Sequence, residues 1–172
     1  MGFRPIAVAA ALLLLVGGAG PALADDEATA VKLTPQALQT IDEGELGVAP
    51  VGSAQEIAPA LFALPVARVS LSRSGKVRAI RLGGGLRLFG EAEPLDLTKL
   101  RLNLPARRAS VKDSASGSRV AAFDVGKLKV SQRRVRGVLL IAPGASAVFN
   151  EQFDTYVFRD GLRFARFSYP LQ

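Results

Sequence analysis

Hydrophobic residues recur at every second position through most of this chain, and that period limits what the chain can fold into. Leucines alternate with polar residues at 95–97 and again at 100–104. Because successive side chains of a β-strand point to opposite faces, this alternation predicts half-buried strands. Strands are expected at 61–71, 76–82, 86–88, 95–97, 100–104, 120–125, 127–130, 135–141 and 162–169, and residues 109–111 are expected to lead into a loop.

The two leucine runs are out of phase with each other. Their apolar positions are odd in the first run and even in the second. A slip of one residue turns a buried face to water, so both runs can serve one core only if a bulge or bend lies near Thr98 and Lys99. Three successive glycines at 83–85 also interrupt a strand pattern. They predict a kink, a bulge or a close backbone approach inside a sheet.

Two segments depart from the strand period and predict short helices. Thr34 can cap a helix that begins at Pro35, and Gly44 can end it. The second helix, at about 144–154, is indicated by an apolar stripe of Ala145, Val148, Phe149 and Phe153. Residues 25–32 are polar and are expected to be irregular. The predicted fold is all-β, a sandwich or open barrel of about eight antiparallel strands with helices near 35–43 and 144–154.

The first 24 residues have the pattern of a secretory signal peptide. Arg4 precedes an unbroken apolar run at 6–16, and the segment closes at Ala22-Leu23-Ala24 before Asp25. The run is shorter than the roughly 20 residues of a membrane span. We therefore expect a signal peptide at 1–24 and a single domain at 25–172. With no cysteine and no second apolar stretch, the mature product is expected in the extracellular space or on the envelope.

The residue types that are missing narrow the chemistry. The chain has no histidine, cysteine or tryptophan, and its one methionine is Met1. Histidine triads, cysteine nucleophiles and metal sites built on these side chains are therefore excluded. The remaining acids are thinly placed along the sequence, so we expect no enzyme, no catalytic residues and no metal site.

The charge balance points to anionic partners. The chain carries 22 Lys and Arg against 15 Asp and Glu, a formal net charge of +7 at pH 7. A basic surface attracts anions, which outside the cell are wall polymers, lipid head groups or acidic ligands. Nucleic acid is not expected, because the chain is predicted to be exported and has few aromatic residues for stacking.

Aromatic residues gather near the C-terminal end: Phe149, Phe153, Tyr156, Phe158, Phe164, Phe167 and Tyr169. This cluster has two interpretations. One is an ordinary hydrophobic core. The other is a wall of an apolar pocket with a tyrosine hydroxyl at its mouth.

The order of motifs across residues 48–169 resembles the HtaA domain family of secreted actinobacterial proteins. The matching segments are the strand at 61–71, the glycine-containing segment 75–88, the leucine runs at 95–104, the strand at 120–125, the helical segment 142–150, and Tyr156 with Gly161. The resemblance implies a β-rich extracellular domain. For the founding members of the family it implies haem capture for iron uptake.

The haem-binding members of that family have an aromatic N-terminal motif with a tyrosine ligand, supported by a histidine. In this chain the corresponding segment, 33–44, holds no aromatic residue, and there is no histidine. If ferric haem binds through an oxygen ligand, the two tyrosines, Tyr156 and Tyr169, are the candidates. Tyr156 is preferred, because it follows the aromatic helix and precedes Gly161 on a connection.

Two functions therefore remain open on the sequence. The first is a secreted, non-enzymatic binding module for haem or another hydrophobic ligand in iron acquisition. The second is a structural or adhesive envelope protein that binds anionic wall polymers through a basic face.

Overall fold

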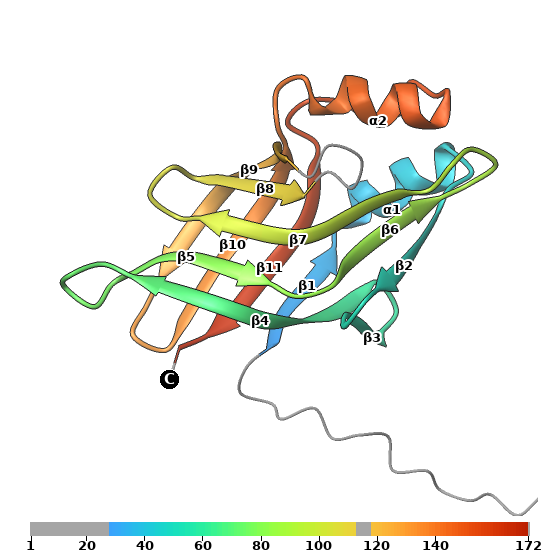
Figure 1. The fold of residues 1–172 in the computed structure, drawn as a ribbon. Helices are drawn as coiled ribbons and strands as arrows, with labels where there is room; N and C mark the ends of the chain where they lie inside the picture. The colour runs from blue at the N-terminus through green and yellow to red at the C-terminus, as the bar shows by residue number, and fades with distance from the viewer. Residues whose placement is uncertain (1–27, 113–117, 172) are drawn as a thin grey trace, which may run out of the picture.

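The computed structural model describes residues 28–112 and 118–171, in which strands dominate (Figure 1). The strands are β1 (Ala28–Leu33), β2 (Gly47–Val51), β3 (Gln55–Ala58), β4 (Leu61–Leu71), β5 (Val77–Leu82), β6 (Gly85–Phe89), β7 (Leu95–Asn103), β8 (Arg108–Lys112), β9 (Arg119–Val130), β10 (Arg134–Ile141) and β11 (Arg163–Pro170). The helices are α1 (Pro35–Glu43) and α2 (Ala145–Phe153). The predicted signal peptide, 1–24, lies outside the described residues.

Eight antiparallel strands close into a ring. Their order is β7-β5-β4-β1-β11-β10-β9-β8, and β8 pairs back with β7. Strands β6 and β2 extend the sheet beyond β7, and β3 adds to β4. The predicted all-β fold of about eight strands with two short helices is confirmed. Figure 1 shows β4, β5, β7 and β8 in front of β1, β9, β10 and β11, with α2 at one end.

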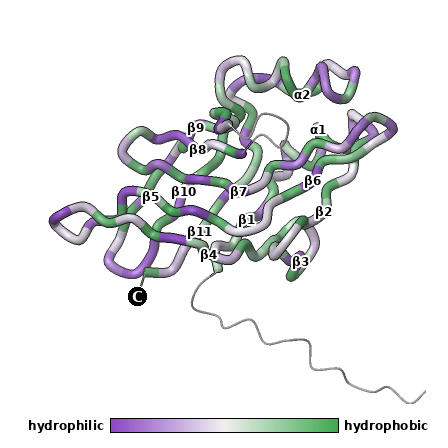
Figure 2. The backbone as a smooth tube through the Cα atoms, viewed as in Figure 1, coloured by the Kyte–Doolittle hydropathy of each residue, from purple (hydrophilic) through white to green (hydrophobic). Residues whose placement is uncertain are grey.

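The predicted bulge near Thr98 and Lys99 is confirmed. Lys99 has a positive φ of 51°, and the register between β7 and β8 shifts between Thr98 and Arg101. Because of this extra residue, both leucine runs face the core, and Leu97 and Leu102 are buried. The alternation of apolar and polar residues along the strands is visible in Figure 2.

The glycines at 83–85 allow the close backbone approach that was predicted. Gly84 has φ +63°, and a Cβ there would lie 2.5 Å from the amide nitrogen of Ala54. A Cβ on Gly85 would lie 2.3 Å from the carbonyl oxygen of Leu97. Because these glycines have no side chains, the chain can pass directly from β5 to β6, and both strands pair with the same edge of β7. The turn between β2 and β3 can then pack against the glycine backbone.

The expectation that residues 25–32 are irregular is wrong for 28–32, which belong to β1. This strand pairs with β4 on one side and β11 on the other, and Thr29 and Val31 are buried. Small side chains hide its alternation in the sequence. Its strand conformation depends on partners that are far away along the chain.

Both helices are capped by polar side chains. Thr34 accepts a hydrogen bond from the Ala37 amide of α1 at 3.1 Å, as predicted. Helix α2 begins after Gly144, and its cap comes from Asp160 instead, which accepts bonds from the Gly144 and Ser146 amides and from the Ser146 hydroxyl. These bonds lower the pKa of the Asp160 carboxyl and fix the loop after α2 to the helix.

Candidate functional site

Side chains fill the interior of the barrel. The largest fully buried side chains include Phe62, Phe123, Phe164 and Phe167. The void that remains among them and the neighbouring leucines measures about 20 Å³, which is room for about one water molecule. Within the described residues, a ligand must therefore bind at the outer surface.

The aromatic cluster near the C-terminal end belongs mainly to this core. Phe149 contacts Phe123 at a ring-centre distance of 6.3 Å and Phe158 at 5.5 Å, both edge to face. Phe123 also lies 5.1 Å from Phe164. The cluster thus joins α2 to β9 and β11 and stabilises the end of the barrel.

The two candidate tyrosines lie in different surroundings. Tyr169 is 9% exposed in β11, opposite Val135, and belongs to the core. Tyr156 is 88% exposed on the loop after α2. The side chain of Asn150 anchors this loop, because it exchanges hydrogen bonds with the backbone N–H and C=O of Phe158 at 3.0 and 2.9 Å.

The surroundings of Tyr156 are acidic. Its neighbours Asp154 and Thr155 line a recess of about 240 Å³ together with Glu43, Glu45 and Glu91. Carboxylates here repel an anionic ligand at close range. The structure therefore offers the Tyr156 hydroxyl to solvent at the acidic end of the molecule.

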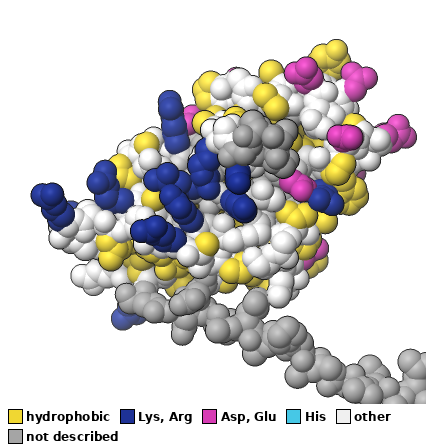
Figure 3. Space-filling model, in the orientation of Figure 1, with side chains coloured by type: hydrophobic (Ala, Val, Ile, Leu, Met, Phe, Trp, Pro, Cys, Tyr) yellow, Lys and Arg dark blue, Asp and Glu magenta, His cyan; other side chains and the backbone are white. Residues whose placement is uncertain are grey.

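Positive and negative side chains occupy separate parts of the surface. Figure 3 shows Lys and Arg gathered over the strands of the barrel, and Asp and Glu gathered toward the end that carries α2 and the β6–β7 hairpin. Within the eight strands of the ring, only β7 and β9 contain an acid, Asp96 and Asp124. Among the described residues the one ion pair is Arg87 with Asp96, whose side chains approach to 2.6 Å. This pairing lowers the pKa of Asp96.

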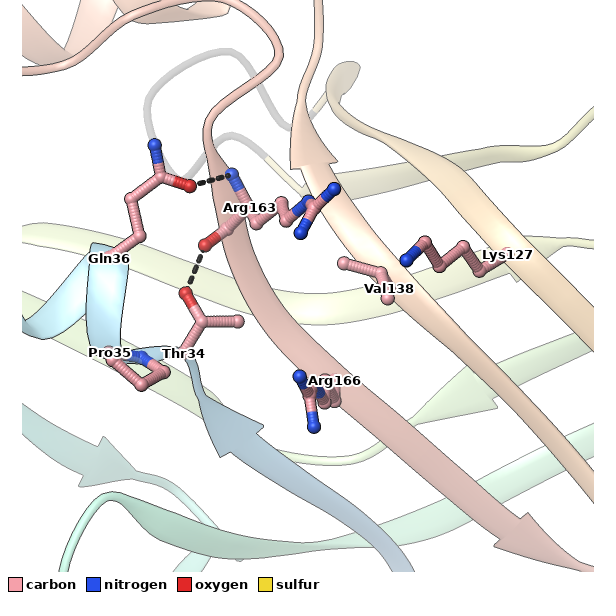
Figure 4. A pocket seen from close by; sticks show the side chains of 7 residues that line it. All are labelled: Thr34, Pro35, Gln36, Lys127, Val138, Arg163 and Arg166. Carbon is pink, nitrogen blue, oxygen red and sulfur yellow. Dashed lines mark hydrogen bonds between the residues drawn. The ribbon is translucent and has the colours of Figure 1, made fainter.

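One pocket brings three cations together. It has a volume of about 440 Å³ beside the start of α1. We call it the α1 pocket, and its lining is Thr34, Pro35, Gln36, Lys127, Val138, Arg163 and Arg166. No acid belongs to this lining. Figure 4 shows the charged groups of Arg163 and Lys127 turned toward the side chain of Val138.

Polar contacts of the first turn of α1 hold one wall of the α1 pocket. The Thr34 hydroxyl donates to the carbonyl oxygen of Arg163, and the Arg163 amide donates to Gln36 Oε1 at 3.4 Å (Figure 4). These bonds tie α1 to the beginning of β11. The cap of the helix and the wall of the pocket therefore share the same residues.

Two irregularities in the strands bring the cations to this wall. The register between β10 and β11 shifts between Leu139 and Leu140. At this bulge two successive residues of β11, Phe164 and Ala165, are both buried. The residues on either side of them, Arg163 and Arg166, are therefore both exposed on the outside of the barrel. In β9, Lys127 has φ +47° beside a register shift in the β9–β10 pairing. Bulges re-aim side chains in this way.

The sequence did not single out the cations of the α1 pocket. Lys127, Arg163 and Arg166 are ordinary members of a basic strand surface when they are viewed along the chain. Only the pairing of β9, β10 and β11 places them around one apolar residue, Val138. Arg166 also lies opposite Lys32 of β1, which adds a further positive charge near the pocket.

The fold is similar to that of a protein of known structure. The C-terminal domain of HtaA from Corynebacterium glutamicum aligns with a TM-score of 0.56 and 14% identity, over 86% of this chain and 98% of that domain. No protein-family model and no curated protein sequence matches the chain. The predicted resemblance thus holds for the fold. Among the described residues, no helix has the length and apolar character needed to cross a membrane.

Proposed function

We propose that this chain is a secreted, non-enzymatic binding module of the bacterial envelope, and that its α1 pocket holds an anionic ligand with an apolar body. The observation that carries the proposal is the set of three cations, Lys127, Arg163 and Arg166, around Val138 with no acid in the lining. Guanidinium groups bind carboxylates and phosphates in paired hydrogen bonds. Val138 and Pro35 offer apolar contact to the rest of the ligand.

Haem belongs to this class of ligand, because it combines a large apolar ring with two carboxylates. The HtaA-like fold supports haem as the first ligand to be tested, while the filled barrel directs it to the outer surface. Absence of histidine and cysteine, together with acids that gather away from the pocket, supports a binding role rather than catalysis.

The pocket is tested by removing two of its charges. We expect Arg163→Ser combined with Arg166→Ser to weaken binding of ferric haem, and of iron-free protoporphyrin, by about tenfold or more, since hydrogen bonds to charged groups contribute about 1.5–3 kcal/mol each. Titration followed by absorbance or fluorescence measures this. The matched control is Lys129→Ser with Arg136→Ser, a cross-strand pair outside the pocket lining. An equal loss in both variants, or no saturable binding by the unmodified chain, contradicts the proposal.

A separate prediction concerns the iron. The lining of the α1 pocket contains no tyrosine, so a tyrosinate ligand requires that haem binds elsewhere on the surface. In that case Tyr156→Phe should abolish the tyrosinate charge-transfer band and leave the fold intact, because the side chain is 88% exposed. Tyr169→Phe keeps the buried ring and serves as the comparison. Absorbance spectra of both haem-loaded variants decide between the two residues. A haem spectrum that neither substitution changes would show that no tyrosine ligates the iron.

A second candidate function is attachment to an anionic wall polymer through a basic face. It is favoured by three stretches of sequence without an acid, at 57–90, 125–150 and 161–172, which hold six, five and two cations respectively. Such a charge pattern attracts a polyanion along its length and loses strength as salt screens it.

A further inference from the structure

Three arginines face one another across adjacent strands on the front of the barrel. Arg68 of β4 lies opposite Arg81 of β5, and Arg81 lies opposite Arg101 of β7. Residues paired in this way point to the same side of a sheet, with Cβ atoms about 4.5–5.5 Å apart. Strand positions next to them, such as Ile80 and Leu102, are fully buried, so the arginines point outward.

Arg119 of β9 joins this group from the other side. Its guanidinium donates to the Ser110 carbonyl at 3.0 Å, to the Ser110 hydroxyl at 3.2 Å and to the Lys99 carbonyl at 2.7 Å. Ser110 itself lies opposite Arg101. Partial burial and the positive charges of Arg81 and Arg101 lower the pKa of Arg119. We call Arg68, Arg81, Arg101 and Arg119 the arginine row.

The arginine row has no compensating acid within the described residues. None of its members forms an ion pair with another described residue, and within the same part of the chain the Nε atom of Arg101 is buried without a hydrogen-bond partner. Like charges directly opposite one another destabilise a sheet. A bound anion would relieve this repulsion and would add acceptors for the outward-facing guanidinium groups of the row. Figure 3 shows this cationic face open to the viewer.

We infer that the arginine row binds consecutive phosphate groups of a phosphodiester polymer that carries no bases. The inference rests on the second candidate function, wall attachment, and names its contact residues and the chemistry of its partner. Each phosphodiester leaves two unesterified oxygens, which can accept hydrogen bonds from neighbouring guanidinium forks, and arginine is well suited to bind phosphate in this way. Bases are excluded from the proposal because binding them usually needs aromatic platforms. The one aromatic residue of β4, β5, β7 and β8 is the buried Phe62.

The experiment compares two double variants of equal charge loss. One is Arg81→Ser with Arg101→Ser in the arginine row, and the other is Lys129→Ser with Arg136→Ser on β9 and β10. The mature chain is titrated with a synthetic glycerol-phosphate oligomer over a series of salt concentrations. An oligogalacturonate and a single-stranded oligonucleotide with the same number of charges are titrated alongside it.

We expect the arginine-row variant to bind the glycerol-phosphate oligomer about tenfold or more weakly, and the control variant to change little. The slope of log affinity against log salt should fall by about 0.7 for each phosphate that the variant no longer neutralises, as for single strands. Without polymer, the arginine-row variant should melt at the same temperature as the unmodified chain or higher, because repulsion has been removed. A lower melting temperature would contradict the proposed like-charge repulsion.

Other outcomes would overturn the inference in distinguishable ways. Equal losses in both double variants mean that general surface charge holds the polymer, so wall attachment stands and the arginine row fails. Tighter binding of the oligogalacturonate removes phosphate as the recognised group, and tighter binding of the oligonucleotide removes the base-free polymer as the partner. If the unmodified chain binds none of the three at low salt, wall attachment fails together with the inference.

Discussion

Replacing Phe123 by alanine should lower the free energy of unfolding by about 3–5 kcal/mol. Phe123 is 2% exposed in β9 and lies between the rings of Phe164 and Phe149, 5.1 and 6.3 Å away. It also borders the small void in the core, which the substitution would enlarge. Because Phe123 links β9 to α2 and β11, few neighbours can move to fill the space.

Urea unfolding followed by circular dichroism measures this loss. The control is Val130→Ala at the end of the same strand, where the side chain is 55% exposed. Exposed substitutions usually change stability by no more than about 0.5 kcal/mol. A loss below about 1 kcal/mol for Phe123→Ala would mean that the aromatic cluster is not the packed core described above.

Replacing Gly84 by alanine should be nearly as harmful, at about 2–5 kcal/mol, through the backbone rather than the core. The residue has φ +63°, and a Cβ would lie 2.5 Å from the Ala54 nitrogen and 2.7 Å from the Val51 carbonyl oxygen. Both contacts are with backbone, which cannot rotate away as a side chain can. The turn between β2 and β3 would therefore have to separate from the start of β6.

Gly75 provides the matched control for this prediction. Its φ is +75°, but a Cβ there would meet nothing within 4 Å. Gly75→Ala should therefore cost only the conformational term, about 1–2 kcal/mol. The difference between the two unfolding free energies isolates the steric contact. Equal losses for both substitutions would contradict the close approach at Gly84.

The sequence predicted those elements that are marked by a pattern within a few neighbouring residues, such as hydrophobic alternation or a helix cap. Alternation gave β4 with its bounds, and the phase change between two leucine runs gave the bulge at Lys99. Thr34 and Pro35 gave the start of α1. In each case the signal lies within a few residues, because side chains alternate at a fixed period and helix caps act over one turn.

Elements that depend on distant partners were not predicted. β1 was expected to be irregular, and β2, β3 and β8 were not identified. β3 is exposed along its whole length and has no apolar face to mark it. Such strands form because another strand offers unpaired backbone groups at the right place, which the local sequence does not record.

The candidate site shows the same division. Elimination of residue types led to Tyr156 and Tyr169, but the structure places the first in solvent and the second in the core. The cations of the α1 pocket and of the arginine row were visible only as scattered positive charge. Which of them meet is decided by register and by bulges in β9 and β11.

By itself, the sequence determined a β-rich fold with two short helices and a surface with excess positive charge. It also excluded catalytic and metal sites built on histidine or cysteine. These follow from composition and from local periodicity, which do not depend on how the chain closes. Only the tertiary structure decided that the ring closes through β7 and β8, that its interior is full, and which cations lie together. The reason is physical: strand pairing joins residues that are far apart in sequence, and a shift of one residue moves a side chain to the opposite face.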